Sequence, residues 1–170
     1  MGLLRQRSGA IMTFNGIPFH PLFVHFGVCL MVLFALLQLV MVVSTKARVR
    51  VGVFLPIMGI FTALMALITK QTGEMLGEVT TDVNWRPHGE LGDLAAGATL
   101  ALCAVSILYW LGSEKISGAY NPRLVQASAR FLSSGIVRTL IVVAAVLASL
   151  ATLVLTFMAG HTGAGLVWTN

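Results

Sequence analysis

The chain has 170 residues, of which 57% are hydrophobic and only 10% are charged, and its net charge is +5. Soluble domains carry about a quarter charged residues, so this composition argues against a soluble fold and indicates an integral membrane protein. The basic residues lie between apolar runs and not among aromatic residues. This pattern favours the lipid bilayer over nucleic acid as the partner.

Four long apolar segments predict four membrane-spanning helices, because about 20 apolar residues in a helix cross the hydrocarbon core of a bilayer. In chain order they cover about residues 21–43, 51–72, 88–111 and 136–160. Helices are expected because backbone groups in lipid must be hydrogen-bonded within their own segment. We therefore predict an all-α fold, an integral membrane four-helix bundle that forms a single transmembrane domain over residues 1–170. We find no convincing internal repeat, because both helical hairpins begin near a His but nothing else aligns.

The Lys and Arg residues predict the orientation of the bundle. Most of them follow the first or the third span, and the rest lie on the other side of the membrane. Since cytoplasmic loops are enriched in basic residues, both termini are expected to be extracytoplasmic in a bacterial inner (cytoplasmic) membrane. Residues 121–134 are expected to form either a short helix on the cytoplasmic leaflet or a polar loop. The basic residues assigned to the cytoplasmic side are Lys46, Arg48, Arg50, Lys115, Arg123, Arg130 and Arg138.

Several kinds of site are missing from the sequence. Cys29 and Cys103 lie in apolar runs without a CxxC or CxxCH pattern, which argues against a zinc knuckle and covalent c-type haem. Both are expected to be small core residues and not a disulfide. The sequence has no P-loop, HExxH or GxSxG motif. We leave open whether the protein is an enzyme, and favour a redox carrier or complex subunit over a stand-alone enzyme.

The four histidines are expected to lie at one face of the membrane. His20 and His25 begin the first span, His88 opens the third, and His161 closes the fourth, so the topology brings all of them to the same side. Histidines at a membrane boundary are candidates for function because they are costly without a partner. Most of the carboxylates lie in the connection on that same side: Glu74, Glu78, Asp82, Glu90 and Asp93.

The first functional hypothesis is a membrane electron-transfer protein that binds haem b near the extracytoplasmic face. Two facing histidines would be the axial ligands of a six-coordinate haem. We expect His25 to pair with His88 or His161, and His20 to hold a propionate, because His20 and His25 are about 140° apart around a helix.

Two alternatives stay open. The histidines and carboxylates together would suit copper, zinc or iron, with His25, His88, His161, Glu90 and Glu74 as candidate ligands. The protein could instead be a structural subunit of a respiratory or photosynthetic complex. In that case the histidines would be hydrogen-bonded boundary residues, or would hold a lipid or quinone. A homo-oligomer would enlarge any of these sites.

The motifs around the histidines resemble those of a known family. Residues 20–26, HPLFVHF, resemble the HPLLVHF opening of a family of predicted bacterial membrane proteins, catalogued as a domain of unknown function. The resemblance continues with Thr-Gly at residues 72–73 and His-Gly-Glu at residues 88–90. It closes at residues 160–168, GHTGAGLVW, which are similar to a GHxGGxLVY motif.

The resemblance covers the chain from Gly16 to Trp168. This chain has Ala164 and Trp168 where the family motif has Gly and Tyr, and Glu90 is shifted by one position. Related domains occur beside Rieske or c-type cytochrome domains. The resemblance therefore implies a four-helix membrane domain, redox work at the outer membrane face, and a redox-protein or membrane-complex partner.

Overall fold

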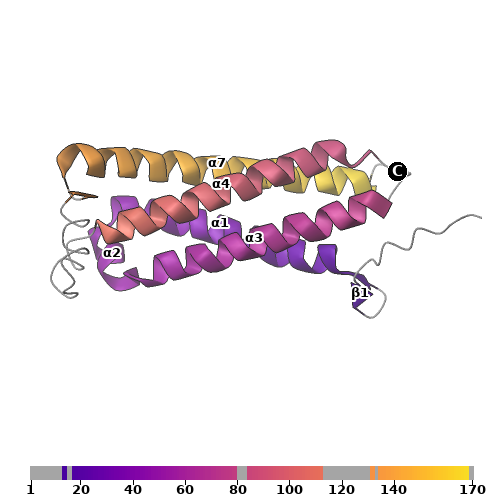
Figure 1. The fold of residues 1–170 in the computed structure, drawn as a ribbon, viewed down its shortest axis with the longest axis horizontal. Coiled ribbons are helices and arrows are strands. Elements are labelled where there is room, and N and C mark those ends of the chain that lie inside the picture. The colour runs from indigo at the N-terminus through magenta and orange to yellow at the C-terminus, as the bar shows by residue number, and fades with distance from the viewer. Residues whose placement is uncertain (1–12, 15–16, 80–83, 113–130, 133, 169–170) are drawn as a thin grey trace, which may run out of the picture.

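The computed structural model describes residues 13–14, 17–79, 84–112, 131–132 and 134–168 (Figure 1). Two-residue strands β1 (Thr13–Phe14) and β2 (Ile17–Pro18) pair antiparallel before the first helix. The helices follow in the order α1 (Phe19–Val43), α2 (Thr45–Val51), α3 (Phe54–Val79), α4 (Arg86–Leu111) and α7 (Gly135–Trp168).

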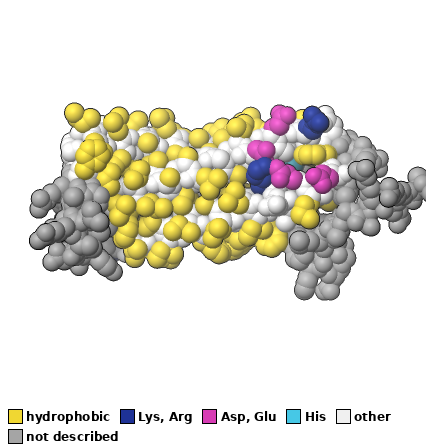
Figure 2. Space-filling view, in the orientation of Figure 1, with side chains coloured by type: hydrophobic (Ala, Val, Ile, Leu, Met, Phe, Trp, Pro, Cys, Tyr) yellow, Lys and Arg dark blue, Asp and Glu magenta, His cyan; other side chains and the backbone are white. Residues whose placement is uncertain are grey.

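Four of these helices are long and apolar enough to cross a membrane, which confirms the predicted all-α membrane bundle. The candidate spans are Phe23–Val43, Phe54–Glu78, Arg86–Leu111 and Gly135–Leu166. Large apolar side chains cover the outer surface of the bundle between its two ends (Figure 2). Among the most exposed are Leu33, Leu64, Leu147 and Phe157. In a bilayer these side chains face the acyl chains, so their exposure carries no penalty.

The helix boundaries differ from the predicted spans where short-range signals are strong. The second span begins at Phe54, because α2 ends at Val51 and is capped by Gly52, whose φ of 48° favours glycine. The fourth helix continues through the glycines of residues 160–165, where predicted helix ended at 160. Glycine costs only about 1 kcal/mol in a helix, and contacts with the neighbouring helix offset that cost. Most of the surface helix expected over residues 121–134 lies outside the described residues.

Each long helix packs against two neighbours. Helix α1 lies between α3 and α7, α4 lies between the same two, and α1 and α4 are diagonal to one another. Both α1 and α4 start at the same end of the bundle (Figure 1). The hairpin α1–α3 is therefore related to the hairpin α4–α7 by an approximate two-fold axis that runs along the bundle. Repeats of this parallel kind also build some transporter folds.

Direct contacts between equivalent residues establish that axis. Ser106 Oγ donates to Gln38 Oε1 over 2.7 Å, and Tyr109 Oη donates to the Met41 carbonyl over 2.9 Å. The members of both pairs are separated by 68 positions. Residues related by a two-fold axis touch one another only where they lie beside it. The structure thus shows an internal repeat. The sequence analysis missed it because the residues of these facing pairs are chemically unlike.

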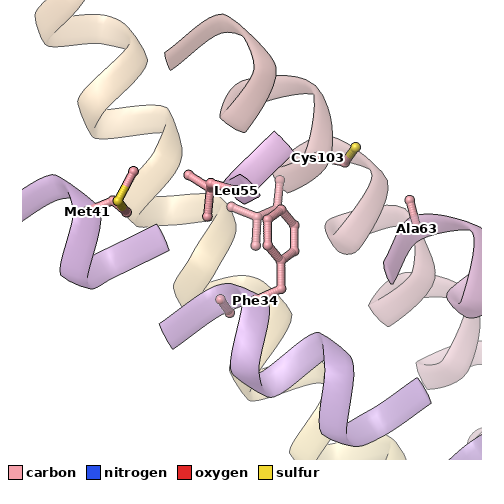
Figure 3. Close-up of a cluster of buried hydrophobic side chains, with 7 residues drawn as sticks. Phe34, Met41, Leu55, Ala63 and Cys103 are labelled. Carbon is pink, nitrogen blue, oxygen red and sulfur yellow. The ribbon is translucent and has the colours of Figure 1, made fainter. Parts of the chain in front are cut away.

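The core combines apolar packing with hydroxyl groups satisfied inside their own helices. Phe34 and Leu55 are fully buried in a cluster shown in Figure 3. The hydroxyls of Thr62 and Thr152, at equivalent positions, each donate to the carbonyl four residues earlier. This satisfies polar groups that lipid cannot. Gln38 Nε2 is buried without a hydrogen-bond partner, which costs stability.

The two cysteines are both free. Cys103 is buried in the cluster of Figure 3, as expected of a small core residue. Cys29 is exposed on the outside of α1, so its prediction as a core residue is wrong. In a transmembrane helix an apolar run continues around the lipid-facing side, and apolar neighbours therefore do not indicate burial within the bundle.

Candidate histidine site

His20 of α1 and His88 of α4 face one another across the two-fold axis at one end of the bundle. Their ring centroids are 6.4 Å apart, and the ring planes make an angle of 73°. The two side chains occupy equivalent positions in the two hairpins. Both are partly buried, although they lie near the start of their helices.

The same hydrogen bond orients each of these imidazoles. His20 Nδ1 lies 3.1 Å from the Thr69 carbonyl oxygen, and His88 Nδ1 lies 3.0 Å from that of Ala159. A carbonyl can only accept, so each Nδ1 carries the proton and each Nε2 keeps its lone pair. A backbone carbonyl on Nδ1 is the usual way in which proteins fix the ring of a histidine that binds a metal through Nε2.

A Thr-Gly pair completes each half of the site. Thr72 and Thr162 donate their hydroxyls to the carbonyls that hold the two histidines, both over 3.0 Å. The next residue is glycine in each case. A Cβ atom at Gly73 would lie 2.8 Å from Cε1 of His20, and one at Gly163 would lie 2.8 Å from Cε1 of His88. Only glycine lets the rings lie this close to the facing helix.

The surroundings favour the uncharged form of His20. His20 lies just before the first candidate span, which begins at Phe23. Burial lowers the pKa of His20 below its ordinary value of 6.5, and the positive charge of a protonated His88 would lower it further. The hydrogen bond to Thr69 opposes these effects without reversing them. A neutral imidazole is the form that binds metals.

His25 and His161 are exposed and are held by their own helices. His25 Nδ1 donates to the Pro21 carbonyl over 2.7 Å. The ring of His161 stacks on Phe157, with centroids 6.4 Å apart and an angle of 12° between the planes. The structure therefore brings together His20 and His88, and not the predicted pair of His25 with His88 or His161. Helix α1 starts at Phe19, so His20 sits inside the helix and turns inward while His25 turns out.

The predicted site of several metal ligands is not assembled. Lys70 forms ion pairs with Glu74 and, over 2.8 Å, with Asp93 on the outer surface of α3 and α4. Glu90 is exposed. Within the described part of the chain, no group of three or more His, Cys, Asp or Glu side chains could hold a metal ion. The charged side chains at this end of the bundle are visible in Figure 2.

The fold and the site together define a four-helix membrane bundle built from two hairpins, with an oriented histidine pair where the hairpins meet. Residues 16–170 match the family described as "Predicted membrane protein (DUF2231)", and the chain belongs to that family. No curated protein and no solved structure matches the chain.

Proposed function

We propose that the protein is a membrane electron carrier that holds haem b between His20 and His88. The observation that carries the proposal is the pair of imidazoles itself. Each ring has its Nδ1 fixed by a carbonyl from the facing helix, and the two rings come from diagonal helices of one bundle. Bundles commonly build cofactor sites from inward side chains on facing helices.

The separation of the rings fits two ligands on opposite sides of one iron. A metal-bound imidazole nitrogen lies about 2.0–2.1 Å from the ion, so two rings bound in this way have centroids roughly 6.3 Å apart. The observed separation is 6.4 Å. Two axial imidazoles are free to differ in rotation about the bonds to the metal, so the angle of 73° is compatible with this arrangement. A tetrahedral ion would bring the same two rings closer together.

The residues around the pair would have distinct roles. Thr69 and Ala159 orient the two rings through their carbonyls, and Gly73 and Gly163 leave the rings room against the facing helices. When bound, the haem would supply one-electron chemistry. His20 and His88 would together hold the haem, and two histidine ligands favour electron transfer over the binding of oxygen or a substrate. This is the reason for proposing a carrier and not a stand-alone enzyme.

The charge distribution supports an extracytoplasmic position in a bacterial inner membrane. Helix α2, with Lys46, Arg48 and Arg50, lies at the end opposite the histidine pair. Basic residues favour the cytoplasmic side, so the histidine end would face outward. The carboxylates of Glu74, Glu90 and Asp93 are exposed at that end. They would attract a redox protein with a basic docking surface.

A visible absorption spectrum tests the proposal. Protein purified from a haem-replete bacterial host should show a Soret band and the sharp reduced bands of a six-coordinate low-spin haem. His20→Gly and His88→Gly should each lose this spectrum, and added imidazole should restore it if the variant is folded. His25→Ala and His161→Ala are matched controls, because both side chains are exposed, and they should keep the spectrum unchanged.

The other outcomes separate the alternatives. No Soret band in the wild-type protein refutes the haem proposal. A stoichiometric metal without porphyrin absorbance would indicate a copper, zinc or iron site. If both are absent, a structural subunit of a membrane complex is favoured. Loss of the haem spectrum in His25→Ala and not in His20→Gly would restore the pairing expected from the sequence.

A further inference from the structure

The opposite end of the two-fold axis carries a second matched pair, Arg48 and Arg138. The amide of Arg48 donates to the Ser44 carbonyl over 3.1 Å, and the amide of Arg138 donates to that of Ser134 over 2.8 Å. Ser134 and Arg138 follow Ser44 and Arg48 by the same number of residues along the chain. Thr162 follows Thr72 by that number too. The repeat therefore places an arginine at the same position in each hairpin.

Both guanidinium groups act on one side chain beside the axis, Tyr109. The Tyr109 hydroxyl donates to the Met41 carbonyl over 2.9 Å. The charged groups of Arg48 and Arg138 both lie close enough to that hydroxyl to interact with it electrostatically. Two cationic side chains thus lie near the same point at this end of the bundle.

The donors of Arg48 are only partly used. Its Nη2 donates to Thr45 Oγ1 over 3.0 Å, whereas its Nε is buried without a hydrogen-bond partner. Leaving a charged donor buried and unpaired is costly. The carboxylates of the described residues lie toward the histidine end, near the end of α3 and the start of α4, so they do not neutralise this pair. They are Glu74, Glu78, Glu90 and Asp93.

We propose that Arg48 and Arg138 bind the phosphate group of an anionic lipid in the leaflet opposite the histidine pair. Guanidinium groups match phosphate oxygens in geometry and charge. The surroundings favour a lipid over free phosphate, because Val43, Val49 and Phe54 beside the pair are each more than half exposed and offer an apolar surface to acyl chains. Headgroup pockets of this kind are expected at the cytoplasmic ends of helices.

Thermal unfolding of the purified protein in a neutral detergent tests the site. Added phosphatidylglycerol should raise the unfolding temperature of the wild-type protein, and phosphatidylcholine should not. Arg48→Gln and Arg138→Gln should each lose most of that rise. Arg50→Gln is the matched control, since Arg50 is exposed on the same helix and its loss changes the net charge equally. It should keep most of the rise.

Three results would overturn the proposal. An equal loss in Arg50→Gln would mean that the lipid responds to diffuse charge and not to the pair. An equal rise with millimolar inorganic phosphate would assign the site to the free anion. No rise with phosphatidylglycerol in the wild-type protein would mean that the two arginines bind no anionic lipid. The yield of folded protein and the unfolding temperature without added lipid show whether each variant is intact.

Discussion

Replacing Gly163 by Ala should damage the histidine site without removing any group that binds a ligand. A Cβ atom there would lie 2.8 Å from Cε1 of His88, where ordinary contact begins at 3.4 Å. The imidazole must therefore move by about 0.6 Å, which is more than the tolerance of about 0.2 Å in a metal–ligand distance. Gly73→Ala should act on His20 in the same way, because its Cβ would approach that ring equally closely.

The effect on stability can be worked out against a control in the same helix. Nothing lies within 4 Å of a Cβ atom added at Gly160. Gly160→Ala should therefore gain about 0.5–1 kcal/mol, the ordinary advantage of Ala over Gly in a helix. Gly163→Ala has the same gain, offset by an overpacking cost of about 1–3 kcal/mol. We expect the second variant to be about 1–3 kcal/mol less stable than the first.

Two measurements check this prediction. Unfolding in mixed micelles of increasing denaturing detergent gives the difference in stability between the two variants. The Soret absorbance per protein gives the haem content, which should fall in Gly163→Ala and stay unchanged in Gly160→Ala. If the two variants are equally stable and equally loaded, the close approach of His88 to α7 is not a constraint, and the steric reasoning is wrong.

Three further predictions concern other parts of the molecule. The pKa of His20 in the folded protein lies below 6.5, so the unfolded state binds the proton more readily. The free energy of unfolding of the haem-free protein should therefore fall as the pH drops below about 6.5, and level off above it. A pH titration of His20→Asn should be flatter, and an equally steep curve would point to another group. Ser106→Ala should cost about 1–3 kcal/mol in detergent unfolding, because Gln38 Oε1 loses the hydrogen bond that it accepts from Ser106. The double variant with Gln38→Leu should be nearly neutral. Equal losses would contradict a role for that bond. Alkaline phosphatase fused to the C-terminus should be active if the histidine end is extracytoplasmic, and inactivity would reverse the orientation.

The sequence predicted the bundle well because each span is a long apolar run that has few alternatives in a membrane. It also brought all four histidines to one end, which follows from topology alone. It could not choose between His20 and His25, because that choice depends on whether helix α1 starts before or after Pro21. It starts at Phe19. One residue of helix phase rotates a side chain by about 100°.

The repeat was harder to detect for a different reason. The sequence contains Thr-Gly at residues 72–73 and again at residues 162–163, and this was the signal that could have revealed both halves of the histidine site. The rest of the two hairpins differs because side chains in contact have changed size together, one becoming larger where its neighbour became smaller. Gly59, for example, makes room for the ring of Phe34, and the equivalent pair is Ser149 and Leu102. The two pairs fill a similar total volume with different residues, so the repeat is not visible as sequence similarity.

The two-fold axis also bears on how such a chain could arise. Two copies of one hairpin that paired with themselves could place only identical residues opposite one another on the axis. Joining the copies in one chain lifts that restriction, and Gln38 opposite Ser106 is a pairing that a symmetric dimer cannot make. At the histidine end of the axis the facing residues are identical, since His20 lies opposite His88. Identical residues thus face one another at the proposed ligand site, whereas the residues that face one another beside the axis in the core differ.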